Sequence, residues 1–322
     1  MRRIAPPARQ RGVALLTAIL LVALGTILAA SMAYENALTA RRAQATFALD
    51  QSLLIAEAGE ALAAYALRET RKAYPAQVYP AQPWSMPYGP AEIVPGITLE
   101  AHLEDMAGRF NLNSLVDQTG TINPATLAVF ENLLENLGLE SKWGALIADW
   151  IDADSVAYGA DGAEDATYLS QMPPYRTANV LITSTSELLA LPGFGRDRYL
   201  RLAPYVSALP QDVRINLCSA SGPVLDALIG PGHREYSGLD PQTLAVDRKQ
   251  SCYPLKKDFD TSFNGDSKAQ AAADVMIAET SDYFRLTSIV NIGTTQFALY
   301  SLMHEENGGT KIHTIQRTFT AD

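Results

Sequence analysis

The sequence has few of the residues that catalysis, disulfide frameworks and nucleic-acid binding require. Two cysteines in 322 residues are too few for a disulfide-rich scaffold, although they can form one bridge. The chain has four histidines in unrelated contexts: His102, His233, His304 and His313. No nucleophile and base converge with them, so we expect a protein that is not an enzyme. The 25 basic residues are outnumbered by 35 acidic ones, and the net charge of −10 argues against nucleic acid as a partner.

Charge is missing altogether from one segment near the N-terminus. No charged residue lies between Arg11 and Glu35, and the apolar run Val13–Ala33 is 21 residues long. At about 1.5 Å per residue, this run spans the hydrocarbon core of a bilayer, which is about 30 Å thick. The apolar core of an ordinary signal peptide is shorter, about 7–15 residues. Arginines precede the run and Glu35 follows it, which places the N-terminus in the cytoplasm and the remainder outside.

Proline is absent from the following segment, residues 35–72, and the only glycine there is Gly59. Alanine and leucine dominate this segment, and both are strong helix formers. One face remains mostly apolar along the positions Leu49, Leu53, Ala56, Glu60 and Ala63. The sequence therefore predicts that the membrane helix continues outward as an amphipathic helix, to about Lys72, over a length of roughly 90 Å.

The remainder of the chain alternates between helical and extended patterns. Six prolines in residues 73–96 predict a surface connection without regular structure. Alternating apolar residues predict strands over residues 97–105, 213–218, 282–291, 295–305 and 311–320. Helical spacing predicts helices over residues 123–138, 141–151, 183–191, 197–206 and 221–228. Residues 253–270 are polar and are predicted to form a loop.

An acidic segment, Ala148–Tyr168, contains no basic residue. Its acids are Asp149, Asp152, Asp154, Asp161, Glu164 and Asp165, with Gly159 and Gly162 among them. Hard oxygen ligands on a glycine-bent loop suit calcium, which takes about 6–8 oxygen atoms. The spacing is not that of an EF-hand, because Ala157 stands where that loop needs glycine and Ala163 where it needs glutamate. The residues alone leave two readings open, a metal site or a solvated acidic loop.

The turn Leu191–Gly195, with its sequence LPGFG, resembles a helix-hairpin-helix. In DNA-binding versions, glycine amides and nearby basic residues approach a phosphate. Arg196, Arg198 and Arg201 could serve that purpose here. The segment therefore offers one function to be weighed, the binding of DNA through this hairpin.

The two cysteines, Cys218 and Cys252, stand in the part of the chain predicted to be exported. In an oxidising compartment a bridge between them is expected, and two buried free thiols are the alternative. A bridge would close a loop of about 35 residues and contribute about 3–4 kcal/mol in the chain-entropy model.

The N-terminus resembles that of a type IV prepilin, with a short basic leader ending in Gly12 and a long apolar helix that becomes amphipathic. The resemblance implies that a prepilin peptidase cuts between Gly12 and Val13 and that the new N-terminus is methylated. Pilins carry glutamate as the fifth mature residue, and here that position is Thr17. Because the pilin glutamate neutralises the amine of a neighbouring subunit, a subunit without it is suited to the tip of the filament.

A more specific resemblance comes from six segments in order: RFNLNSL, DWIDAD, GAEDATY, PYRTANV, SELLALPGF and PYVSALP. Together with the N-terminus they resemble the K minor pseudopilins of type II secretion systems, over residues 10–220. The resemblance implies an α+β, pilin-like fold with a large inserted α-helical domain. It also implies calcium near Glu164 and Asp165, and we extend the ligand set to Asp152, Asp154 and Asp161.

The same resemblance implies the domain limits and the partners. The limits are 1–12 for the leader, 13–34 for the transmembrane helix, 35–106 and 209–322 for the two parts of the pilin-like domain, and 107–208 for the insertion. The expected partners are the I and J minor pseudopilins, the major pseudopilin filament, the inner membrane, prepilin peptidase and exported proteins. The expected role is to cap the tip of a periplasmic pseudopilus and to help initiate its assembly. The alternative is a minor pilin of a type IV pilus or a DNA-uptake system that uses the LPGFG hairpin to bind DNA.

Overall fold

The computed structural model describes residues 12–239 and 241–320, and the chain divides into two compact units, up to Leu54 and from Ile55 onward. The first unit is the beginning of the helix α1 (Val13–Ala73). Its apolar side chains are exposed, for example Leu21 at 69%. A window of this helix has a mean hydropathy of 2.6, and the helix is long and apolar enough to cross a membrane. The predicted apolar helix is therefore confirmed, whereas residues 1–11 of the predicted leader lie outside the described residues.

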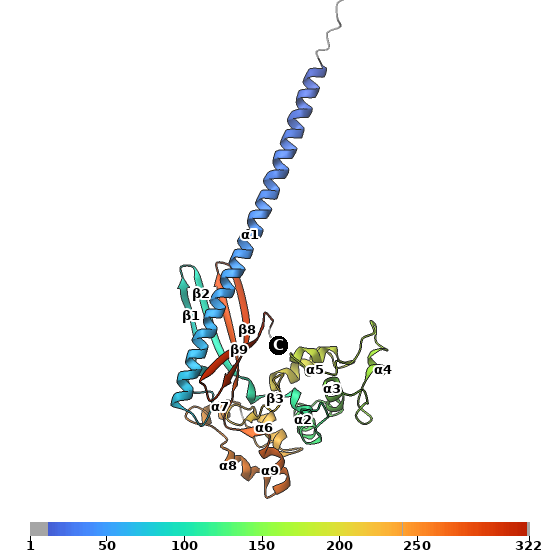
Figure 1. Ribbon diagram of the computed structural model, residues 1–322, viewed down its shortest axis with the longest axis vertical. Helices are drawn as coiled ribbons and strands as arrows, with labels where there is room; N and C mark the ends of the chain where they lie inside the picture. Colours follow the sequence, from blue (N-terminus) through green and yellow to red (C-terminus); the bar gives the residue numbers. More distant parts are fainter. Residues whose placement is uncertain (1–11, 240, 321–322) are drawn as a thin grey trace, which may run out of the picture. The chain divides into compact units, whose positions relative to one another are not determined.

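The second unit contains a five-stranded antiparallel sheet in the order β1-β2-β7-β8-β9 (Figure 1). Its strands are β1 (Tyr88–Val94), β2 (Ile97–Asp105), β7 (Tyr283–Ile292), β8 (Thr295–Glu306) and β9 (Lys311–Thr318). The strand predicted over residues 97–105 and the three C-terminal strands are thus confirmed. Short turns join β7, β8 and β9, as the glycines between them indicated.

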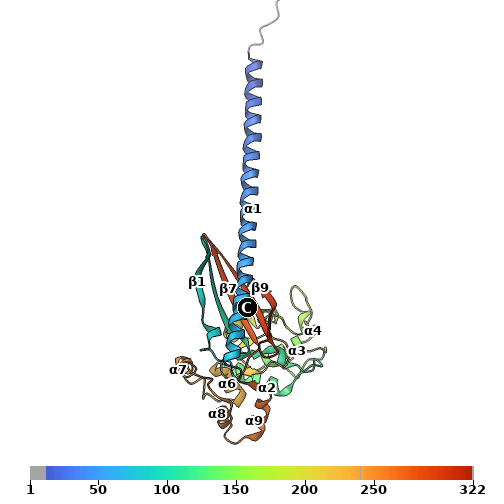
Figure 2. The same ribbon diagram turned by 60° about the vertical axis from the view of Figure 1, so that its left-hand side comes forward.

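The later part of α1 packs on this sheet, as Figure 2 shows. Ala63 lies in one apolar cluster with Leu286 of β7 and Met303 of β8. Leu67 lies in a second cluster with Trp84 and Phe284, whose rings meet edge to face at 5.1 Å. The predicted coverage of the apolar helix face by the C-terminal strands is confirmed from Ile55 onward. Leu49, which the pattern placed on the same face, is 52% exposed.

Neighbouring strands β2 and β7 are far apart in sequence, so residues 106–282 form an insertion between them. The insertion carries the helices α2 (Pro124–Asn136), α3 (Trp143–Ile151), α4 (Asp165–Tyr168), α5 (Gly195–Leu202), α6 (Gly222–Ile229), α7 (Pro241–Asp247), α8 (Lys256–Phe259) and α9 (Ser267–Asp274). Two short parallel pairs also lie in it: β3 (Phe110–Asn111) with β4 (Val206–Ser207), and β5 (Ile215–Asn216) with β6 (Ile277–Ala278).

One apolar core holds the insertion together. It extends from Phe110 to Ile277 and includes large side chains of α2, α3 and α6. Its centre is aromatic, with Phe110 stacked on Phe130 at 5.1 Å. This core continues past residue 208, where the sequence placed the end of the insertion. The domain limits themselves stay a prediction.

The connection predicted without regular structure over residues 73–96 is wrong in its second half, because β1 occupies Tyr88–Val94. Pro90 lies within this strand, and proline is tolerated there because β1 is an edge strand with one unpaired side. The register shifts between Tyr88 and Ala91, next to Gly89, whose φ of +85° is accessible to glycine. A bulge therefore accommodates the proline that the sequence pattern treated as a strand breaker.

Three further predictions differ from the structure in extent or type. The strand over residues 213–218 shrinks to β5, because only Ile215 and Asn216 find a partner, in β6. The helix predicted over residues 183–191 is a 3₁₀ helix, Thr185–Ala190, closed by a capping box between Ser184 and Glu187. The loop predicted over residues 253–270 contains α8, a 3₁₀ helix (Asp260–Phe263) and the start of α9, because Phe259 and Phe263 are buried in the core.

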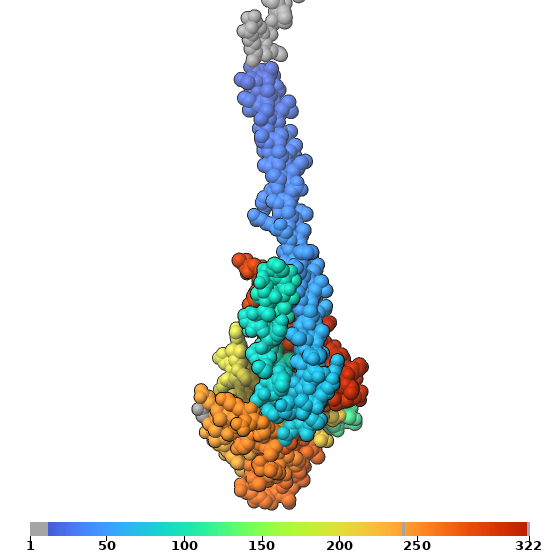
Figure 3. Space-filling view, turned by 90° about the vertical axis from the view of Figure 1, so that its left-hand side faces the viewer, coloured from blue at the N-terminus to red at the C-terminus, as the bar shows by residue number. Residues whose placement is uncertain are grey.

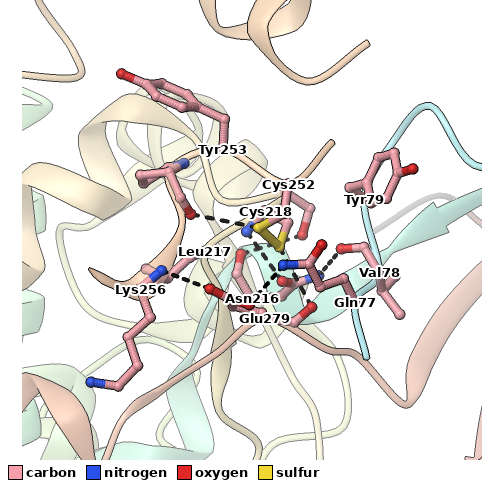
Figure 4. The surroundings of a disulfide bond; sticks show 12 residues. Gln77, Val78, Tyr79, Asn216, Leu217, Cys218, Cys252, Tyr253, Lys256 and Glu279 are labelled. Carbon is pink, nitrogen blue, oxygen red and sulfur yellow. Dashed lines mark hydrogen bonds between the residues drawn. A yellow bond between two sulfur atoms is a disulfide. The ribbon is translucent and has the colours of Figure 1, made fainter. Parts of the chain in front are cut away.

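A disulfide joins Cys218 to Cys252, and both residues are buried (Figure 4). Asn216 donates to the carbonyl oxygen of Val78 at 2.8 Å, so this segment is also tied to the loop after α1. The chain from α7 to α9 lies beside that loop in Figure 3. The disulfide therefore joins two segments of the insertion, and the hydrogen bond of Asn216 ties the first of them to the segment that connects α1 with the sheet.

Candidate metal centre

Three buried carboxylates meet at the end of α3. Asp149 and Asp152 are three residues apart, which puts them on one face of the helix, and the chain returns with Glu164 just before α4. One oxygen of each residue lies within 4.8 Å of the others. We call Asp149, Asp152 and Glu164 the acidic trio. They are 0%, 2% and 8% exposed.

The returning loop wraps closely around Asp149. The backbone N–H groups of Tyr158 and Ala163 donate to its carboxylate at 3.1 and 2.7 Å. A Cβ atom on Gly162 would stand 2.3 Å from the Oδ2 atom of Asp149, so only glycine fits there. Behind the loop, the rings of Trp150 and Tyr168 are 5.2 Å apart and form an apolar wall. The loop therefore encloses the carboxylate rather than leaving it in solvent.

Electrostatics in the acidic trio is unfavourable when all three groups are ionised. Burial, followed by repulsion from Asp154 and the other two members, raises the pKa of Asp152 to about 7. Burial also raises the pKa of Asp149 to about 6, although two backbone N–H groups oppose the shift. The pKa of Glu164 is raised too, mainly by burial. Within residues 12–239 and 241–320, no basic side chain forms an ion pair with any member.

Several oxygen atoms at this place are enclosed and have no hydrogen-bond partner. They are Oδ1 of Asp152, Oε1 of Glu164 and Oδ1 of Asn179. Buried polar atoms in proteins are nearly always paired, so unpaired oxygens on two carboxylates of the trio need a partner of opposite charge. Hard oxygen donors with a net negative charge are the ligands that calcium binds. The residues present therefore fit a calcium ion.

The expected ligands divide into two sets in the structure. Asp152 and Glu164 are in the trio. Asp154 is exposed but close enough to repel all three members, and Asp165 is held by Thr177 and by Arg176. Asp161 is exposed and its charge acts on Glu131 instead.

Two residues that the structure places at this site were not among the predicted ligands. Asp149 was counted among the acids, and its three-residue spacing from Asp152 was the signal that could have added it. Asn179 carries no such signal, because its place follows from a later turn with φ of 48°. Its amide donates to the carbonyl of Asp154. Thr177 contributes as a supporting residue, since its hydroxyl donates to Oε2 of Glu164 at 2.9 Å.

The N-terminal positions singled out in the sequence lie at the start of α1. The N–H of Leu16 donates to the carbonyl of Gly12 at 3.3 Å, and Val13 is the first residue of the helix. The hydroxyl of Thr17 donates to the carbonyl of Ala14 at 3.0 Å. Thr17 therefore satisfies its own polar group within the helix and offers no charge.

The arginines of the LPGFG hairpin are used inside the insertion. Arg198 donates to the carbonyls of Gly193 and Phe194 at 3.0 Å, and its guanidinium lies 4.9 Å from the centre of the Trp143 ring. Arg201 donates to the carbonyls of Leu137 and Gly138, just after α2. Arg196 has none of these contacts, so two of the three arginines are engaged within the insertion.

Comparison with a solved structure identifies the fold. The chain is similar to a chain in the crystal structure of the GspK-GspI-GspJ complex from the type 2 secretion system of enterotoxigenic Escherichia coli, with a TM-score of 0.75 and 22% identity. The likeness covers 87% of this chain and 100% of the other. The long apolar helix, the antiparallel sheet and the helical insertion are thus the fold of a pilin-like protein.

Comparison of sequences identifies the family. The family model for type II secretion system protein K matches residues 108–211. Type II secretion system protein K of Pseudomonas aeruginosa is 33% identical over 96% of this chain and 92% of its own length. The protein of the same name from Pectobacterium carotovorum is 31% identical over 97% of both chains. The chain belongs to the protein K family of type II secretion systems.

Proposed function

We propose that this chain is a minor pseudopilin that caps the tip of the periplasmic pseudopilus and helps other minor pseudopilins to initiate its assembly. The assembly serves the export of folded proteins across the outer membrane. The observation that carries the proposal is Thr17, which takes the place of the pilin glutamate and turns its hydroxyl back onto its own helix. A subunit without that carboxylate has no charge to offer to the amine of a subunit above it. Its role is structural rather than catalytic.

The anchor follows from the first unit. The precursor would span the inner membrane once, with its N-terminus in the cytoplasm and the bulk in the periplasm. Prepilin peptidase would cut between Gly12 and Val13, and the new amine would be methylated. The side chains of the apolar segment are exposed, so they need lipid first and the helices of neighbouring pseudopilins afterwards.

The partners at the tip would be the I and J minor pseudopilins, with the major pseudopilin filament below. The fold likeness to a complex that contains K, I and J supports this choice. In the described part of the chain, the arginines Arg198 and Arg201 are held in internal contacts, which does not favour the DNA-binding alternative.

The position in the filament can be tested by labelling. Overproduced pseudopili carrying an epitope on the C-terminus of this chain are expected to bind gold particles at one end only. The matched variants are Thr17→Glu, which supplies the missing carboxylate, and Thr17→Ser, which keeps the hydroxyl. We expect Thr17→Glu to enter the shaft and Thr17→Ser to remain at the end. Labels along the shaft of unaltered pseudopili would contradict the proposal.

Processing can be tested by intact mass and N-terminal sequence. With prepilin peptidase we expect a methylated N-terminus at Val13, and without it an uncut chain beginning at Met1. Gly12→Leu should block the cut, and Gly25→Leu, a change in the same apolar run, should not. A cut after about residue 33 in the presence of the peptidase would exclude the pilin pathway.

We also propose that the acidic trio, with Asp154, Asp165 and Asn179 around it, binds calcium. The ion would neutralise three buried carboxylates and so fix the loop between α3 and α4. Calorimetric titration of the full chain in detergent should show calcium binding that Asp152→Asn abolishes. Asp161→Asn should leave the binding unchanged, because Asp161 is exposed and outside the trio. Equal losses in both variants would show that the loop only attracts cations diffusely.

A further inference from the structure

A second cluster of metal-binding side chains lies on the sheet, far in sequence from the acidic trio. It consists of His304 and Glu306 on β8 and His313 on β9. On β8, Met303 and Glu305 face α1, because Met303 packs with Ala63 and Glu305 receives a hydrogen bond from Arg71. Side chains alternate along a strand, so His304 and Glu306 point to the opposite face. We call His304, Glu306 and His313 the histidine cluster.

Strand pairing brings the three side chains together. His304 and His313 are directly opposite each other in the β8–β9 pair, and their ring centres are 5.6 Å apart. The Nε2 atom of His313 is 3.5 Å from Oε1 of Glu306. A register shift between Leu302 and Met303 lies beside this pair, and such shifts re-aim side chains. One nitrogen or oxygen of each residue lies within 4.8 Å of the others.

Neighbouring residues hold the cluster in place. The ring of Tyr283 on β7 is stacked on His304, with 4.4 Å between the ring centres. The Nζ atom of Lys311 donates to Oε2 of Glu306 at 3.1 Å, and Oε1 of the same carboxylate faces His313. The Nδ1 atom of His313 is enclosed and has no hydrogen-bond partner. All three members are partly buried, so water competes less strongly for them than at a free surface.

Two imidazoles and one carboxylate are the ligand set of a transition metal. Zinc binds nitrogen and carboxylate ligands in a tetrahedron, and bonds of about 2.0–2.1 Å place ligand atoms about 3.3 Å apart. The pair of His313 and Glu306 already meets that spacing at 3.5 Å. Calcium and magnesium prefer sites made of oxygen atoms alone, so the cluster and the acidic trio select different ions.

Three protein ligands leave one position of the tetrahedron open. His304 also lines a cavity of about 400 Å³, whose other walls include Gln211, Asp212, Arg214 and Tyr283. A water molecule or a further ligand can reach the metal from that side. The segment of Gln211–Arg214 belongs to the insertion, whereas the cluster belongs to the sheet.

We propose that His304, Glu306 and His313 form a binding site for a divalent transition metal, with zinc as the preferred ion. The metal joins the edge strand β9 to β8 next to the turn that connects these two strands. This inference does not depend on the proposed function, because it concerns only the sheet face turned away from α1.

The test is a zinc titration of the full chain in detergent, purified with a tag that contains no histidine and freed of metal with EDTA. In competition with a chromophoric chelator, we expect one zinc ion per chain in the micromolar range or tighter. His304→Gln, His313→Gln and Glu306→Gln should each weaken binding by at least about tenfold. His102→Gln and His233→Gln are the matched controls and should bind as the unaltered chain does. Binding that is absent, or equally weakened in the controls, would overturn the proposal.

Cobalt provides a second measurement that folding defects do not imitate. Co²⁺ added to the full chain should give the visible absorption of a tetrahedral nitrogen and oxygen site, and one equivalent of zinc should remove it. The spectrum should survive Asp152→Asn and an excess of calcium, and it should be lost in His313→Gln. A spectrum of six-coordinate cobalt, or displacement by calcium, would contradict the assignment. Circular dichroism of the variants in EDTA, expected to match the unaltered chain, separates lost ligands from lost fold.

Discussion

Two groups of buried carboxylates in the second unit are held in opposite ways. Glu60 of α1 receives two N–H groups from Arg317, each at 2.7 Å. Burial by itself would raise the pKa of Glu60, but hydrogen bonds from Arg317, Ser301 and Thr314 outweigh it, so that pKa lies below its usual value. In the acidic trio, by contrast, burial and mutual repulsion raise the pKa of Asp152 to about 7.

The difference lies in the available partners and not in burial. Glu60 fastens the helix to the edge of the sheet, and its charge is balanced within the chain. Arg71 and Glu305 form an ion pair further along α1, at side chains 9% and 1% exposed, although burial there outweighs the pair and raises the pKa of Glu305. In the acidic trio no basic side chain among the described residues balances the negative charge, as expected of carboxylates that bind a cation. Among these groups, the carboxylates with a basic partner fasten α1 to the sheet, and the trio without one is the place where we propose a cation.

The largest effect should come from breaking a balanced pair. Arg71→Met leaves Glu305 buried without its partner, and breaking such a pair costs about 3–5 kcal/mol. Urea unfolding of the full chain in detergent, followed by tryptophan fluorescence, measures this loss. The adjacent change Lys72→Met is the control, because Lys72 is exposed and should lose little. Equal stability of both variants would mean that the Arg71 contact does not fasten the helix.

The next effect should come from supplying the missing charge to the trio. Calcium at about a hundred times its dissociation constant should stabilise the chain by about 2.7 kcal/mol, because it binds the folded state alone. Asp152→Asn should remove this response. In EDTA the same variant should unfold at a temperature no lower than the unaltered chain, since it removes repulsion. A strongly destabilised variant in EDTA would show that the trio is balanced by something else.

A smaller effect should come from Thr177, which supports Glu164 through its hydroxyl. Thr177→Val removes one hydrogen bond at 2.9 Å from a member of the trio. Supporting contacts of this kind change metal affinity by about tenfold or more, so calcium titration should show a loss of that size. Ser170→Ala, in the same loop region, should change nothing. A Thr177 variant with unaltered affinity would remove this residue from the site.

The smallest effect concerns acid. The pKa of Glu60 is lowered in the folded state, so its contribution to stability is present above the ordinary value of about 4.5 and is lost as the pH falls through the lowered value. Because Arg317 is 46% exposed, we expect at most about 1 kcal/mol. Unfolding curves between pH 3 and 6 should therefore slope less for Glu60→Gln than for the unaltered chain. Glu69→Gln is the control, and identical slopes for all three would refute the assignment.

The sequence predicted the elements that repeat a regular pattern. The apolar helix, the strand over residues 97–105 and the three C-terminal strands follow from periodicity, and all are present. Strand β1 was not predicted, because Pro90 is tolerated only at a sheet edge. Which strand lies at the edge depends on the arrangement of the whole sheet. Asp149 could have been placed by its helical spacing from Asp152. Asn179 and the histidine cluster could not, because they depend on a turn and on strand register.

The insertion between β2 and β7 has a consequence for the order of folding. The hairpins β1–β2 and β7–β8–β9 form from local contacts, but the β2–β7 pair must close a loop of residues 106–282. Closing so long a loop costs only about 2.6 kcal/mol more than closing one of ten residues, because the entropy grows with the logarithm of length. The long loop therefore delays the pairing of β2 with β7 and costs little stability. Synthesis delivers α1 and β2 long before β7, so the part of the helix face that Leu286 and Met303 cover stays exposed until β7 and β8 are made.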